Sequence, residues 1–131
     1  MASSCVLRAT GNDFQVSEYL RNSSFEPVNV FTVGERKSAS SVWDTSGVTV
    51  SVGDGKTFPE QVAEAIAFIR NNSSELLSLK AFAGVEVFEL DFGIFGKEGY
   101  WQSYIFPLEL IHLASDVSLE LELSIYATQE D

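Results

Sequence analysis

Residues 119–125, LELELSI, contain the clearest structural pattern of the chain. Large aliphatic side chains alternate there with Glu120, Glu122 and Ser124, and a period of two residues is typical of a β-strand that buries one face. Residues 88–94, FELDFGI, alternate in the same way. The two stretches therefore predict two strands, each with an apolar face toward a core and a polar, mainly acidic face away from it.

The rest of the sequence predicts four further strands and four helices. We expect the strands at residues 4–10, 28–33, 48–52 and 100–106. We expect the helices at residues 16–20, at 58–70, from Ser73 or Ser74 toward Gly84, and from Pro107 to near Asp116. The helix over 58–70 has the best-defined start, because Thr57 and Glu60 have the spacing of a capping box. The serine-rich residues 37–41 predict a mobile loop.

Together these elements predict a single α+β domain over residues 1–131. Short connections and one-sided alternation favour a mostly antiparallel or mixed sheet of about six strands, with helices packed on one face. The helix over 58–70 and the helix after Pro107 should pack against the sheet through apolar contacts. The residues expected to make them are Val62, Ile66, Ile69, Leu108 and Ile111.

Composition and charge narrow the possible partners. The net charge is −11, and residues 57–131 carry −10 of it. Phosphate groups are neutralised by clustered Lys and Arg, so nucleic acid and anionic membrane surfaces are poor partners for this chain. No apolar run approaches the roughly 20 residues of a membrane-spanning helix. A single cysteine, Cys5, and a start without a signal-peptide pattern predict a cytoplasmic protein.

Several familiar catalytic and metal motifs are missing from the sequence. Residues 52–57, VGDGKT, resemble a phosphate-binding loop, but Val50 stands where that motif needs its first glycine. His112 is the only histidine and Cys5 the only cysteine, so a multi-histidine or multi-cysteine metal site is excluded. We therefore predict no catalytic residue, no metal and no cofactor, and we expect no nucleotide at Gly53 to Thr57.

Acidic and aromatic residues supply the candidate binding site. Spacing of two places Glu89 with Asp91, and Glu120 with Glu122, on single faces of their strands. Such acids could serve acid and base catalysis, hold a divalent cation or bind a basic partner, although a merely solvated sheet face shows the same pattern. Two aromatic groups are candidate ligand contacts, Trp43 beside Asp44 and the 100–106 stretch. In the latter, Trp101 or Tyr104 should reach the face away from the helices.

Scattered turn and core residues also resemble a known family. The residues are Gly11, Asp13, Phe14, Leu20, Pro27, Trp43, the 106–110 stretch FPLEL and the 124–126 stretch SIY. The pattern resembles the small bacterial proteins grouped as domain of unknown function 4279, and it would cover nearly the whole chain. The resemblance implies a lone domain and brings no established catalytic residue. Pro27 is followed by Val28, where the family has a Pro-Thr pair.

Two functions follow as hypotheses. The first is a binding or interaction module, for example of the immunity or regulator type, that docks a basic protein through an acidic sheet face. The alternative is a small-substrate hydrolase or isomerase that uses paired carboxylates in an aromatic-lined cleft. Carboxylates spread over an open face favour the first, whereas two carboxylates inside a concave pocket favour the second. The sequence leaves the oligomeric state open.

Overall fold

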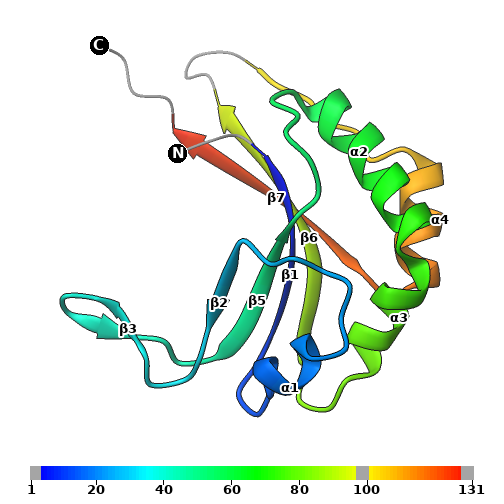
Figure 1. Ribbon diagram of the computed structural model, residues 1–131. Helices are drawn as coiled ribbons and strands as arrows, with labels where there is room; N and C mark the ends of the chain where they lie inside the picture. The colour runs from blue at the N-terminus through cyan, green and yellow to red at the C-terminus, as the bar shows by residue number, and fades with distance from the viewer. Residues whose placement is uncertain (1–3, 97–100, 128–131) are drawn as a thin grey trace.

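The computed structural model describes residues 4–96 and 101–127, which form a sheet covered on one face by helices (Figure 1). The sheet has five strands in the order β2-β5-β1-β6-β7. They are β1 (Cys5–Gly11), β2 (Asn29–Phe31), β5 (Ser46–Ser51), β6 (Val87–Gly96) and β7 (Glu120–Ala127). The helices are α1 (Val16–Leu20), α2 (Phe58–Asn71), α3 (Ser73–Ala81) and α4 (Leu108–Asp116). The predicted α+β class is confirmed, with one strand fewer in the main sheet than expected.

The sheet is mixed, with the first strand at its centre. β1 pairs antiparallel with β5 on one side and with β6 on the other, and β2 pairs antiparallel with β5. β7 runs parallel to β6. Parallel neighbours cannot be joined by a tight turn, and the chain between them contains α4. Figure 1 shows α2, α3 and α4 together on one side of the sheet, which leaves the other face open.

The alternating residues face as predicted. The apolar residues of 88–94 lie in the core, with Leu90 and Phe92 fully buried. Leu121 and Leu123 are partly buried and pack against the same core. Because a register error of one residue would have turned every side chain to the opposite face, these positions confirm the facing of both strands. Ile125, the last residue of the predicted apolar face, is 58% exposed, so the burial of that face ends before it.

The start of α2 confirms the predicted capping box. The Thr57 side chain accepts a hydrogen bond from the Glu60 backbone N–H, and the Glu60 side chain accepts one from the Thr57 backbone N–H. The prediction for α3 was less accurate. Its first turn follows Asn72, no side chain caps it, and the helix ends at Ala81. Gly84 instead has a φ of +93°, in a turn where a side chain would be strained.

Two segments differ from their predicted conformation. Residues 101–106 form no strand; Tyr100 lies outside the described residues. Two aromatic residues of this segment, Tyr104 and Phe106, pack on the helix side instead of pairing in the sheet, and the Phe106 ring lies 5.2 Å from that of Phe92. Residues 37–41, expected to be a loop, belong to a short hairpin of β3 (Arg36–Ser38) and β4 (Ser41–Val42), in which the Ser38 and Ser41 hydroxyls are hydrogen-bonded at 2.8 Å.

The buried face of α4 was also predicted wrongly. Leu108 is 70% exposed and Ile111 is 41% exposed, whereas Leu110 is fully buried and Ala114 nearly so. The helix has apolar residues at both sets of positions, so helical spacing alone does not choose between its two faces. On α2 the prediction is confirmed for Val62 and Ile69, which are buried, and Ile66 packs partly buried against the core.

Candidate functional site

The open face of the sheet brings all four predicted acids together. In the parallel ladder of β6 and β7, Glu89 is the partner of Glu120 and Asp91 is the partner of Glu122. Neighbouring strands are about 4.8 Å apart, so Glu89, Asp91, Glu120 and Glu122 form one surface region, which we call the acidic patch. The alternation of both strands turns these side chains away from the helices. This placement agrees with the prediction from sequence.

Arg8 lies in the middle of the acidic patch and was not among the predicted residues. Its Nη1 atom is 3.1 Å from a Glu89 oxygen, 3.2 Å from an Asp91 oxygen and 3.7 Å from a Glu122 oxygen. Its alternation with the apolar residues Cys5, Leu7 and Ala9 indicates from the sequence which face it lies on, but not which acids it meets. Cys5, Leu7 and Ala9 of β1 are fully buried, so the intervening Arg8 must point to the opposite face.

Three carboxylates thus share a single guanidinium. One oxygen of each of Glu89, Asp91 and Glu122 lies within 4.8 Å of the others. Asp91 is the most enclosed, with its side chain 7% exposed, and it accepts a 2.6 Å hydrogen bond from the Ser124 hydroxyl. With all three acids ionised and Arg8 protonated, this group carries two uncompensated negative charges. A positively charged ligand group would therefore be stabilised here.

Burial and neighbouring carboxylates change the protonation of Glu89. Burial raises the pKa of the Glu89 carboxyl from 4.5 to about 7, and Glu122 and Asp91 add to the increase while Arg8 opposes it. The lowering effect of Arg8 on this pKa is therefore smaller than the combined effect of burial and the two neighbouring acids. Glu89 would become easier to ionise if a second cation approached the acidic patch.

A cleft of about 450 Å³ opens beside the acidic patch on the same face. Its lining residues include Arg8 and Asp91, and the aromatic residues Phe31 and Trp43. The rings of Phe31 and Trp43 stack with their centroids 4.1 Å apart. The ammonium of Lys37 lies 4.7 Å from the centre of the Trp43 ring, a cation–π contact. The prediction that Trp43 could line a ligand groove agrees with this geometry.

Two carboxyl residues line the cleft, Asp91 of the acidic patch and Asp44. Both Asp91 oxygens already accept hydrogen bonds, from Arg8 and Ser124. The other three acids of the patch are not among the lining residues and lie beside the cleft on the open sheet face. The cleft therefore combines two carboxyl residues with aromatic lining, as the enzyme hypothesis requires, while most of the acidic patch has the open arrangement of the binding hypothesis.

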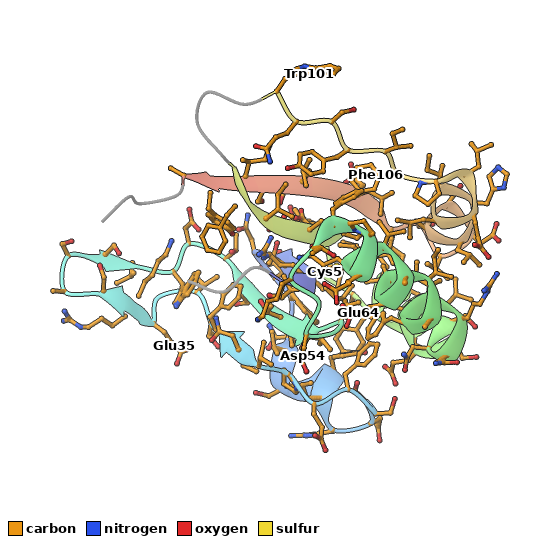
Figure 2. The ribbon with its side chains drawn as sticks, turned by 90° about the horizontal axis from the view of Figure 1, so that it is seen from above. Cys5, Glu35, Asp54, Glu64, Trp101 and Phe106 are labelled. Atoms are coloured by element: carbon orange, nitrogen blue, oxygen red, sulfur yellow. The ribbon has the colours of Figure 1, made fainter. Side chains whose placement is uncertain are left out.

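The two predicted aromatic residues lie apart from the acidic patch. Trp101 is 93% exposed, and Figure 2 shows it projecting from the body of the molecule. Tyr104 packs on the helix side, with its ring 5.2 Å from that of Phe58 at the start of α2. It lines a different cavity of about 700 Å³ together with Ile105 and Pro107. Of the two residues of which at least one was expected on the open face, Tyr104 lies on the helix side, because the segment is not a strand that sends alternate residues to opposite faces.

The glycine-rich turn before α2 holds a carboxylate of the protein itself. The backbone N–H groups of Asp54 and Gly55 donate to the Glu64 side chain at 3.1 and 2.9 Å, and Figure 2 shows Glu64 pointing toward this turn. A nucleotide phosphate bound at this turn would need the same backbone N–H groups as hydrogen-bond donors. The turn therefore has an internal anion in the place of a nucleotide phosphate.

The lone cysteine and histidine have the surroundings of structural residues. Cys5 is fully buried between the sheet and the helices, and burial raises the pKa of its thiol, as do the charges of Asp91 and Glu64. His112 is exposed on α4. A buried thiol with a raised pKa is a poor nucleophile, which agrees with the absence of Cys5 and His112 from the predicted site.

Comparison with known proteins yields no match among family models, curated proteins or solved structures. The resemblance to domain of unknown function 4279 stays a prediction. Within the described residues, no helix combines the length and apolar character that crossing a bilayer requires.

Proposed function

We propose that this protein is a non-catalytic binding module whose acidic patch docks a basic protein partner. One observation carries the proposal: Glu89, Asp91 and Glu122 surround one cation, Arg8, at 3.1 to 3.7 Å. The group has more negative charge than its own arginine can balance. A lysine or arginine from a partner would supply the missing positive charge and reduce the repulsion that the fold alone leaves.

Access to the acidic patch supports the same proposal. The helices cover the opposite face of the sheet (Figure 1), and the Glu122 side chain is 51% exposed. A partner therefore needs no rearrangement of the helices to reach these acids.

We also propose that the protein is cytoplasmic, since a single, buried cysteine suits a reducing compartment. We expect neither nucleic acid nor an anionic membrane as partner, because both repel this charge.

The enzyme alternative has less support. Acid and base catalysis needs two carboxyl groups that reach a substrate with separated pKa values. Glu89 has a raised pKa, but it is not among the residues that line the cleft. Of the two carboxyl residues that do line it, Asp91 already accepts hydrogen bonds from Arg8 and Ser124. Among the described residues that line the cleft, Asp44 therefore has no second available carboxyl group beside it.

A defined basic peptide tests the proposal. Octalysine, added to isotope-labelled protein, should shift the amide resonances of β6 and β7 most, and its affinity should fall as salt rises because screening acts over roughly 8 Å at physiological ionic strength. The double variant Glu120→Gln and Glu122→Gln should bind it more weakly. A matched variant, Glu26→Gln and Glu35→Gln, removes two exposed acids outside the patch and should bind as the wild type does.

The same variants test a natural partner once one is isolated. Its association rate should fall with salt and with the patch substitutions, while dissociation changes less. If octalysine perturbs other strands, or if the two double variants weaken binding equally, the charge of the whole protein rather than the acidic patch is responsible and the proposal is wrong.

A further inference from the structure

The outer edge of β7 is long and pairs with no other strand in the part of the chain that the structure describes. β7 is the last strand of the sheet order and contains eight residues. Within residues 4–96 and 101–127, β6 is its one ladder partner. Figure 2 shows β7 as the strand at the sheet margin. Such an edge presents backbone N–H and C=O groups that can pair with an added strand.

The two faces of this edge differ in chemistry. Glu120 and Glu122 are exposed on the open face, while Leu121 and Leu123 on the helix face are only partly buried. A shallow groove of about 540 Å³ lies along the helix face, between the end of α4 and the start of β7. Ile111, Ala114, Leu119 and Leu121 are among its lining residues.

We propose that the basic partner docks as a sixth strand along the outer edge of β7, using an extended segment in which basic and apolar residues alternate. This inference rests on the proposed function and specifies its binding mode. The basic side chains of such a segment would lie about 4.8 Å from Glu120 and Glu122. Its apolar side chains would extend the helix-side layer beside Leu121 and Leu123 and cover the groove next to α4.

Charge complementarity selects a foreign strand over a second copy of this chain. Pairing β7 with β7 of another molecule would bring the Glu120 and Glu122 side chains of both copies together, and like charges on facing strands are destabilising. Each copy also has a net charge of −11. A segment with lysine or arginine at alternate positions turns this repulsion into attraction.

The opposite edge of the sheet fits such a partner less well. β2 has three residues, Asn29–Phe31, so it offers a much shorter ladder than β7. No acid occurs among those three residues. The length of β7 and its two acids therefore make it the favoured edge.

A synthetic peptide of four Lys-Val repeats with blocked ends is the probe for this mode. Two variants of the peptide carry N-methyl groups, one on every lysine amide and the other on every valine amide. Successive N–H groups of a strand point to opposite edges, so only one variant blocks the edge that faces β7. We expect that variant to bind at least about tenfold more weakly than the parent, because several hydrogen bonds are lost, and the other variant to bind nearly as well.

The protein variants complete the test. Glu120→Gln with Glu122→Gln should weaken parent binding, whereas Glu26→Gln with Glu35→Gln should not. If both methylated peptides bind like the parent while the patch variant still weakens binding, the acidic patch is a charge surface, and strand addition is wrong but the proposed function stands. If neither octalysine nor the repeat peptide binds, both proposals fail. A concentration-dependent dimer of the wild type in sedimentation that repeat peptide does not dissociate would show that a second copy occupies the edge.

Discussion

Arg8 lies directly opposite Glu89 on the neighbouring central strands β1 and β6, and one guanidinium nitrogen is 3.1 Å from a Glu89 oxygen. The same nitrogen is 3.2 Å from an Asp91 oxygen. This cation on β1 therefore compensates acids of β6 that would otherwise repel one another. Its removal and the removal of its partner should have opposite effects on stability.

Replacing Arg8 with methionine should destabilise the fold at pH 8 by about 1–3 kcal/mol, because three carboxylates would be left around an apolar side chain. Urea unfolding monitored by circular dichroism measures the loss. The loss should be smaller at pH 5, where Glu89, with its pKa of about 7, is protonated. Arg21→Met is the control, since Arg21 forms an exposed pair with Glu18 and should cost less than about 1 kcal/mol. Equal effects of both substitutions would show that Arg8 stabilises the fold no more than an arginine in an exposed ion pair does.

Replacing Glu89 with glutamine should stabilise the protein at pH 8. The pKa of Glu89 is about 7 in the folded state against an ordinary 4.5. Between these pH values the folded state binds more protons than the unfolded state, so its stability falls as pH rises. Glutamine removes this loss and keeps an oxygen for Arg8. We expect a gain of about 1–2 kcal/mol at pH 8, little change at pH 4, and a flatter stability curve between them. An unchanged pH slope would contradict the raised pKa.

Leu110→Ala should destabilise the protein by about 2–4 kcal/mol, because Leu110 is fully buried and its truncation leaves a cavity. Leu108→Ala, on the same helix, should change stability by less than about 0.5 kcal/mol, since Leu108 is 70% exposed. Denaturant midpoints of both variants give the comparison. A large cost at Leu108 would mean that α4 buries the face first predicted from the sequence.

ATP or GTP with magnesium should leave the melting temperature unchanged, because the Glu64 carboxylate already accepts from the N–H groups of Asp54 and Gly55. A ligand selective for the folded state adds about 2.7 kcal/mol at a hundredfold excess over its dissociation constant. Thermal shift therefore detects even moderate binding. A dose-dependent rise with either nucleotide would overturn this prediction.

The facing of the acidic patch could be predicted from the sequence, whereas its arginine could not be placed. The period of two in 88–94 and 119–125 is a local property, and it determines which side chains share a face. The contact of Arg8 with Glu89 joins residues 81 positions apart. That contact depends on which strands become neighbours and in which register, and a single strand pattern does not contain this information.

The errors arose where several local patterns were compatible with the sequence. Residues 101–106 have strong β-propensity, but packing of Tyr104 and Phe106 rings against Phe58 on the helix side replaces ladder pairing. Propensity of this kind depends on tertiary context. On α4, Leu108 and Leu110 are equally apolar, and only the position of the sheet decides which of them is buried.

The central place of β1 also sets an order for folding. Leu7 pairs with Val50 on one side and with Leu90 on the other. The first strand in the sequence can therefore complete its hydrogen bonding only after segments far along the chain have reached it. Closing such distant contacts slows folding relative to local ones. Cys5, the partner of Phe92 in the ladder, is the single thiol of the chain and becomes inaccessible only when β6 and the helices have joined β1. Pulses of a thiol reagent during refolding would therefore measure when the central strands come together, as the time at which Cys5 becomes protected, without a mutation.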